Sequence, residues 1–316
     1  MALIPARARG TRLQLLAKAE TTVGTKATGA YAQLPCYSFD MSAQQPQVED
    51  PVLSYGIGRN PMDPFPDALT LKGNAKVPLE TGNIDFWLTL LFGTKVTTGT
   101  TTKTDTWTAG GALPSATFEK GLLDTVDFYE FDGVFADTLG IDIAPSGTAT
   151  MTVGLAALTQ QPVANASIGG TPTRATYGRL LNKSASVLLD STAVANVTGG
   201  TLSISNNLEE VRTVRGDTTG APAGYDAGEL KLDGKLSLRY DSRSMTTAAL
   251  ANAPHTLSLQ WPLTGGYLLS FNFPRCFIET PSVPIAGPGG IEQTINIKAA
   301  YDATAAAAFT VTMTHT

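Results

Sequence analysis

Six carboxylates crowd the stretch between residues 124 and 142, and they form the densest group of side chains in the sequence that could do chemistry. Paired carboxylates can act as acid and nucleophile in glycoside hydrolysis, and a carboxylate cluster can bind Ca²⁺. The spacing matches neither an EF-hand loop nor another calcium motif, so we interpret the series as a solvated acidic face. Its members are Asp124, Asp127, Glu130, Asp132, Asp137 and Asp142.

The other candidates are two histidines, His255 and His315, and two cysteines, Cys36 and Cys276. Neither histidine lies in a pattern resembling a catalytic triad, and no P-loop, dinucleotide-binding glycine motif, HExxH or CxxC occurs. We interpret His255 as a surface turn residue and the cysteines as buried free thiols. We therefore predict no catalytic, cofactor-binding or metal-binding residues, no cofactor, and no enzymatic activity.

The composition limits the possible partners. A net charge of −5 disfavours sequence-independent binding of nucleic acid through phosphate neutralisation. Charged residues make up only 16 %, which suits a surface that neighbouring subunits cover. No apolar run approaches the roughly 20 residues that a membrane span needs, and residues 1–16 lack the apolar core of a signal peptide. We predict that the chain is synthesised in the cytoplasm and does not associate with a membrane.

The most regular elements are a strand over residues 71–79 and a short helix that follows it. Ile84, Trp87, Leu88 and Leu91 have the spacing of one helical stripe, and Gly93 can end the helix. The same order of features returns in residues 230–254. Leu71 and Gly73 correspond to Leu232 and Gly234 with an offset of 161, and residues 129–157 correspond to 271–300 with an offset of 142. This shared order predicts an internal duplication.

Two copies divide the chain into a first domain over residues 1–160, a linker over 161–177 and a second domain over 178–316. The first domain carries a basic N-terminal arm that is either a solvated terminus or a segment that pairs with an adjacent copy. It also carries a proline-rich connection over residues 43–66 that we interpret as an extended hairpin or loop reaching a neighbour. Residues 94–115 are rich in Thr and Gly and predict a mobile surface loop. The alternating residues 309–315 predict a strand that needs an edge to join.

Several segments together resemble the major tail tube proteins of long-tailed bacteriophages. They are the early E-x-x-x-G-T motif of Glu20, Gly24 and Thr25, the strand and helix of residues 71–93, and the segment 203–217. The resemblance covers most of the chain. It implies a mainly β fold of two tandem β-sandwich or half-barrel domains, each with one short flanking helix, in a structural virion protein that stacks as rings around a channel.

Single-domain tube subunits form rings of six domains, so a duplicated chain predicts a trimeric ring with pseudo-sixfold symmetry. The sheets would line the lumen, the helices would lie outside, and an acidic lumen would let double-stranded DNA slide. The resemblance implies self-assembly, contacts with terminator, baseplate or tail-tip and tape measure proteins, and a place in the phage tail after assembly in the host cytoplasm. The alternatives are another tail ring component (a terminator or baseplate hub), a secretion-type tube, or a tandem β-sandwich adhesin or carbohydrate-binding protein.

Overall fold

The computed structural model describes residues 7–52, 55–56, 58–216, 219–285 and 287–316, and the fold is mainly β, as the sequence predicts. Most strands belong to one extensive antiparallel sheet, and two short hairpins stand apart from it. The N-terminal half contains η1 (Gly10–Arg12), β1 (Leu13–Ala19), β2 (Ala32–Gln33), β3 (Ser38–Phe39), β4 (Ser42–Gln44), β5 (Gln47–Val48), β6 (Phe65–Pro66), β7 (Thr70–Pro78), α1 (Ile84–Phe92), β8 (Val96–Thr98), β9 (Lys103–Thr108), β10 (Ala116–Leu122), β11 (Asp127–Ile143), β12 (Thr150–Ala156) and β13 (Thr159–Gln160). The C-terminal half contains η2 (Asn182–Ser184), β14 (Ser186–Leu189), β15 (Thr192–Ala193), β16 (Val197–Ser205), β17 (Glu209–Val211), β18 (Gly224–Asp226), β19 (Lys231–Arg239), α2 (Ser244–Ala251), β20 (His255–Leu263), β21 (Tyr267–Ile278), β22 (Glu292–Ala299) and β23 (Thr310–His315).

The two halves have the same order of strand pairing. In the N-terminal half the ladders run β1-β10-β11-β12-β7, and β3 and β4 then pair with β7. In the C-terminal half they run β14-β20-β21-β22-β19-β16. The strand registers agree as well. Ser42 lies opposite Lys72 and Ser203 lies opposite Asp233, and each residue of the second pair is 161 positions beyond its counterpart. A register shift also falls at the same place in the β10–β11 and β20–β21 ladders.

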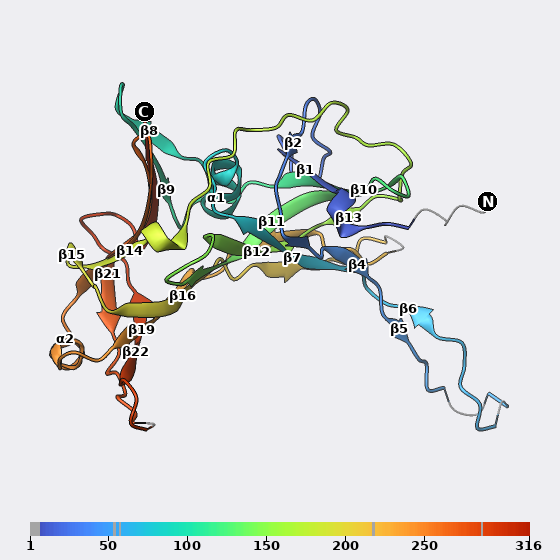
Figure 1. The fold of residues 1–316 in the computed structure, drawn as a ribbon. Coiled ribbons are helices and arrows are strands. Elements are labelled where there is room, and N and C mark those ends of the chain that lie inside the picture. Colours follow the sequence, from blue (N-terminus) through green and yellow to red (C-terminus); the bar gives the residue numbers. More distant parts are fainter. Residues whose placement is uncertain (1–6, 53–54, 57, 217–218, 286) are drawn as a thin grey trace, which may run out of the picture.

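The halves are joined through the main chain. β16 pairs with the C-terminal part of β11, so that Leu139 lies opposite Ile204 and Ile141 opposite Leu202. The result is one continuous run of strands, β7-β12-β11-β16-β19-β22, and one hydrophobic core includes residues of both halves. In Figure 1 this run follows the underside of an arch, with α1 and β1 above it and α2 at the far left.

The two helices differ in burial. The predicted stripe of α1 is confirmed, because Ile84, Trp87, Leu88 and Leu91 are all at most 2 % exposed, and Trp87 packs against Phe118 with ring centroids 5.7 Å apart. By contrast, no residue of α2 is buried, and its Leu250 is 72 % exposed. The second helix therefore lies against the sheet with little covering it.

The prediction of a surface loop over residues 94–115 is wrong. β9 forms within this segment and pairs with β23, which in turn pairs with β21. Trp107 on β9 is 0 % exposed, and its indole nitrogen donates to the Thr89 hydroxyl on α1 at 3.1 Å. The partner strand lies about 200 residues further along the chain, so local composition could not reveal it. The predicted C-terminal strand is confirmed, and it joins two edges within its own chain.

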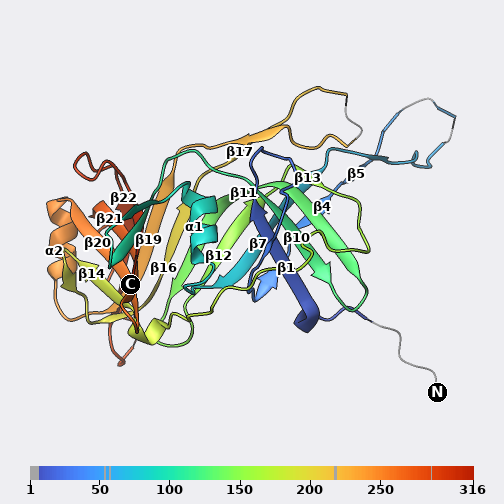
Figure 2. The ribbon, with the colours of Figure 1, turned by 90° about the horizontal axis from the view of Figure 1, so that it is seen from above.

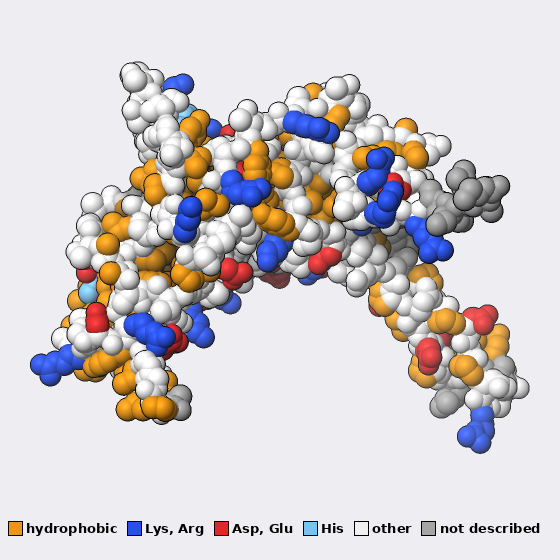
Figure 3. Space-filling view, viewed as in Figure 1, with side chains coloured by type: hydrophobic (Ala, Val, Ile, Leu, Met, Phe, Trp, Pro, Cys, Tyr) orange, Lys and Arg blue, Asp and Glu red, His pale blue; other side chains and the backbone are white. Residues whose placement is uncertain are grey.

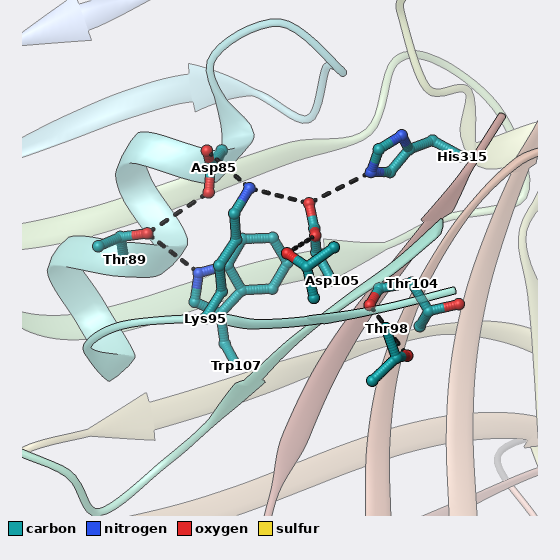
Figure 4. A network of polar contacts seen from close by, with 9 residues as sticks. Asp85, Thr89, Lys95, Thr98, Thr104, Asp105, Trp107 and His315 are labelled. Carbon is teal, nitrogen blue, oxygen red and sulfur yellow. Dashed lines mark hydrogen bonds and ion pairs between the residues drawn. The ribbon is translucent and has the colours of Figure 1, made fainter. Parts of the chain in front are cut away.

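Figure 4 shows the polar network around β9. Asp105 has a side chain only 4 % exposed, and it accepts hydrogen bonds from Lys95 at 2.9 Å, Thr97 at 2.5 Å and His315 at 3.3 Å. Burial tends to raise the pKa of Asp105, but the hydrogen bonds from Lys95 and Thr97 outweigh it and hold the pKa below its ordinary value.

A lowered folded-state pKa means that Asp105 stabilises the fold above the unfolded-state pKa, about 3.9, and that this contribution is lost as the pH falls through the folded-state pKa. We expect Asp105→Asn to lower the free energy of unfolding by about 1–3 kcal/mol at pH 7, with the deficit shrinking below about pH 4. Urea unfolding from pH 7 to pH 2.5 measures it. Asp85→Asn removes the more exposed partner of Lys95 and should have a smaller effect. A pH-independent deficit for Asp105→Asn would contradict this account.

The segment predicted as a linker and the basic N-terminal arm both contact other parts of the same chain. Residues 161–177, predicted as a linker, contact the N-terminal half, where the Phe128 amide donates to the Ala164 carbonyl at 2.9 Å. Within the described part of the basic arm, Arg9 and Arg12 pair with Asp124 at 3.3 and 2.9 Å. Within the single chain these two arginines therefore already have an acidic partner.

Two hairpins project from the sheet, β5–β6 and β17–β18, and Figure 2 shows both extending from the same side. β5 and β6 pair across the connection over residues 43–66, so of the two expected forms, hairpin or loop, the described residues form a hairpin; residues 53, 54 and 57 of this connection lie outside the described residues. Arg212 follows β17 and donates to the Leu69 carbonyl at 3.0 Å. The second hairpin is thus fastened to the base of the first.

Candidate functional site: the exposed sheet face and its open edges

The acidic series of residues 124–142 does not form a solvated face. Glu130 and Asp132 are 8 % and 1 % exposed, and burial raises the pKa of Asp132. Asp137 accepts a hydrogen bond from the Leu208 amide at 3.0 Å, and of the six carboxylates only Asp142 is exposed. The interpretation was wrong because five of the six residues lie on β11 within the sheet, where Glu130 and Asp132 are buried, while Asp124 lies in the turn before β11. They hold segments of the chain together and leave no open pair of carboxylates.

The structure brings together an acid, an imidazole and a thiol that the sequence keeps apart. His255 Nδ1 lies 2.7 Å from Asp190 Oδ2, and Cys276 lies directly opposite His255 in the β20–β21 ladder. His255 is therefore the first residue of a strand and not a turn residue. Cys276 is 0 % exposed, and burial raises the pKa of its thiol to about 12, so the thiolate that a nucleophile requires is disfavoured. Asp190, His255 and Cys276 therefore contribute to the packing of this part of the sheet.

Glu20, from the E-x-x-x-G-T motif, is a structural hub. Its carboxylate accepts from the Gly24 and Gly133 amides, both at 2.8 Å, and from the hydroxyls of Ser115 and Thr117 at 2.6 and 2.9 Å. Gly133 adopts a φ of 63°, which favours glycine at this position. These contacts fix the loop after β1 against β10 and β11.

The exposed face of the run β7-β12-β11-β16-β19-β22 is a candidate functional surface. Residues directly opposite one another on paired strands point to the same face, and the registers place six cations and three carboxylates together, for a net charge of +3. Figure 3 shows that the molecule is hollowed on this side. The cations are Lys72, Lys76, Lys231, Lys235, Arg239 and Lys298, and the anions are Asp142, Asp233 and Glu292. From the sequence we expect acidic residues on the sheets that line the lumen, and this face does not have that acidic character.

One end of the run is the β3–β4 edge beyond β7. Asp40 donates its amide to the Asn74 carbonyl on β7 at 3.1 Å, so the backbone groups of Met41 and Ala43 point away from β7. Side chains of the same half contact these groups. Lys120 Nζ donates to the Met41 carbonyl at 3.1 Å, and Gln160 Oε1 accepts from the Ala43 amide at 3.2 Å.

The other end of the run, on the far side of β22, is formed by residues 280–285, which follow β21 in the chain. Ser282 forms a single bridge with Thr294 on β22, and the residues that follow carry exposed apolar side chains: Val283 is 36 % and Ile285 is 76 % exposed. In Figure 1 this segment and β4 lie at opposite ends of the arch, and Figure 3 shows apolar side chains gathered on the tip of the former, at lower left.

A comparison with protein families decides the assignment. The family model described as "Phage tail tube protein" matches residues 10–299, nearly the whole chain. The chain belongs to the phage tail tube protein family. No curated protein matches it.

Membership of the tail tube family makes this chain a structural component of the virion tail that assembles with copies of itself. The family match includes the Glu20 hub, both strand-and-helix segments, and the β3–β4 edge. Within the described residues there is no group of three His, Cys, Asp or Glu side chains that could hold a metal ion. No helix in the described part of the chain has the length and apolarity needed to cross a membrane.

The sequence could not have revealed the two open edges as sites. Their residues are ordinary strand residues, and what distinguishes them is that no strand of the described part of the chain lies beyond them in the sheet. Only the alternation of apolar residues in 281–285, broken by two prolines, is a local signal.

Proposed function

We propose that copies of this chain close into rings, and that the rings stack into the tail tube through which double-stranded DNA passes from capsid to host. Each ring contains three copies and has pseudo-sixfold symmetry. The observation that carries this proposal is the agreement of strand order and register between the two halves, because a chain with two equivalent units supplies two of six positions.

The proposed domains are residues 1–160 and 178–316, each one tail-tube unit with one helix, joined by residues 161–177. The shared sheet fixes the two units rigidly, because β16 of the second pairs with β11 of the first. A head-to-tail contact of the same kind between chains would use the remaining edges and close the ring.

The hollowed sheet face is the proposed lining of the lumen. Its net charge of +3 would attract phosphate, but three of its six cations have carboxylate neighbours: Lys72 lies 3.9 Å from Glu210, Arg239 lies 3.6 Å from Glu292, and Lys298 lies 3.0 Å from Glu279. Exposed pairs of this kind hold DNA weakly, which suits a conduit.

The proposed tube implies three further kinds of partner protein. A terminator protein would bind one end, a baseplate or tail tip the other, and a tape measure protein would occupy the lumen during assembly in the host cytoplasm. Each would contact surfaces that repeat around the ring.

Electron microscopy of the purified protein tests the proposal. We expect long cylinders of uniform diameter, with three chains per ring in end-on averages. Single rings without cylinders would favour the second candidate, a terminator or baseplate hub, and rings of six whole chains would refute the trimer alone. An adhesin or carbohydrate-binding protein is disfavoured because Trp87, Trp107 and Trp261 are all at most 2 % exposed and offer no aromatic platform.

A further inference from the structure

We propose that residues 280–285 of one copy pair, antiparallel, with the β3–β4 edge (residues 39–44) of the next copy, in the register that β11 and β16 use within the chain. This inference rests on the proposed ring and specifies the contact that closes it. The partner is a second copy of this chain.

The internal β11–β16 ladder is the template. β21 and β22 reproduce the register of β11 and β12 with an offset of 142, including the shift after the bulge, because the Ser282–Thr294 bridge corresponds to Gly140 opposite Thr152. Residues 280–285 therefore already occupy, beside β22, the place that residues 138–143 occupy beside β12. What they lack is the strand on their other side, which β16 supplies to β11.

The offsets fix the register of the contact between chains. In the template Ile141 lies opposite Leu202 and Gly140 opposite Ser203. Adding 142 to the β11 position and subtracting 161 from the β16 position places Val283 opposite Met41 and Ser282 opposite Ser42.

The side chains fit this register. On the core side, Val283 would meet Met41, and Ile285 would meet Phe39, so that two exposed apolar side chains become covered by apolar neighbours. On the opposite side Ser282 would meet Ser42. This is the alternation of the template, in which apolar pairs face the core and small polar residues face the hollow.

The backbone fits as well. In the template register the Val283 amide points at the Met41 carbonyl, and the Pro281 carbonyl accepts from the Ala43 amide. These are the two groups that Lys120 and Gln160 contact in the single chain. Lys120 and Gln160 thus supply hydrogen bonds to the backbone groups of the edge strand until the strand of the neighbouring copy replaces them.

The second half supports this role for Lys120 and Gln160. The positions equivalent to them by strand register are Leu259 and Phe309, which are buried and apolar. Polar substitutes are unnecessary there, because β16 is already paired with β11. The two halves therefore differ where one edge is covered within the chain and the other is left for a neighbour.

Disulfide trapping tests the register. We expect Ser42→Cys/Ser282→Cys to form interchain disulfides in assembled tubes under mild oxidation, because opposite residues of this kind have Cα atoms about 4.5 Å apart, within disulfide reach. Covalent products should stop at three chains. Each single variant controls for Cys36 and Cys276, and Ser42→Cys/Thr280→Cys, two residues out of register, should crosslink at least about fivefold less, since diagonal neighbours lie about 7–8 Å apart.

Tubes that form without the Ser42–Ser282 crosslink, or that crosslink better through the shifted pair, would overturn the proposed register while leaving the tube function intact. Wild-type protein that forms neither rings nor tubes would instead refute the proposed function.

A second pair of variants tests the contact without oxidation. Val283→Asp would place a carboxylate in the apolar seam, and we expect it to raise the protein concentration required for assembly by at least about 100-fold. Because Val283 is exposed in the single chain, the urea unfolding midpoint of the Val283→Asp variant should stay near that of the wild type. Ser282→Asp adds the same charge one residue away on the solvent side and should assemble within about threefold of the wild type. Equal assembly of both variants would overturn the proposal.

Discussion

Removal of residues 310–316 should abolish the cooperative folding of the C-terminal half. β23 lies between β21 and β9, with five residue pairs on one side and six on the other, so its loss exposes two strand edges at once. It also removes the buried side chains of Val311 and Met313. The expected result is a chain that aggregates or loses the sharp urea transition of the wild type, followed by circular dichroism and tryptophan fluorescence.

Two comparisons make this result specific. Removal of Thr316 alone deletes one exposed terminal residue and should leave the transition in place. Adding a synthetic peptide of residues 309–316 to the truncated chain should restore solubility, because a strand supplied in trans can fill a vacant place in a sheet. A truncated chain with wild-type unfolding would show that β23 adds nothing to the fold.

Replacement of Trp107 by Ala is expected to cost about 3–5 kcal/mol of unfolding free energy. The indole is 0 % exposed and contacts three different parts of the structure. It donates to Thr89 on α1, it lies on the strand that pairs with β23, and its ring lies 5.5 Å from the Lys95 ammonium. Urea unfolding at pH 7 measures the change.

Trp107→Phe is the matched control, because it keeps most of the buried ring and removes the indole donor. It should cost about 1–2 kcal/mol, part of which reflects the loss of the hydrogen bond that the indole donates to the Thr89 hydroxyl. A cost for Trp107→Ala no larger than that for Trp107→Phe would show that the site collapses without a cavity and that the packing argument is wrong.

The sequence predicted the parts of the fold that carry a local period. The strand expected over residues 71–79 appears as Thr70–Pro78, and the helix after it as Ile84–Phe92, because alternation and a helical stripe are readable in a short window. Helix α2 was also found, although its stripe is weak and it remains unburied. In each case the residues that determine the element lie within it.

What the sequence could not predict depends on partners far along the chain. The Thr-rich β9 became a strand because β23 pairs with it, and Glu130 and Asp132 of β11 became buried because other layers cover them. The contact between Asp190 and His255 joins residues 65 positions apart. The open edges were unpredictable for the same reason, since an edge is defined by the strands that are missing beside it.

The pairing of β9 with β23 also sets the timing of folding in the cell. About 200 residues separate the two strands, and at roughly 5–20 residues per second the ribosome needs on the order of 10–40 s to make that stretch. During this interval β9 can pair with β8 but lacks β23 on its other side. The part of the sheet that contains β9 and β21 can therefore be completed only after β23 has been made.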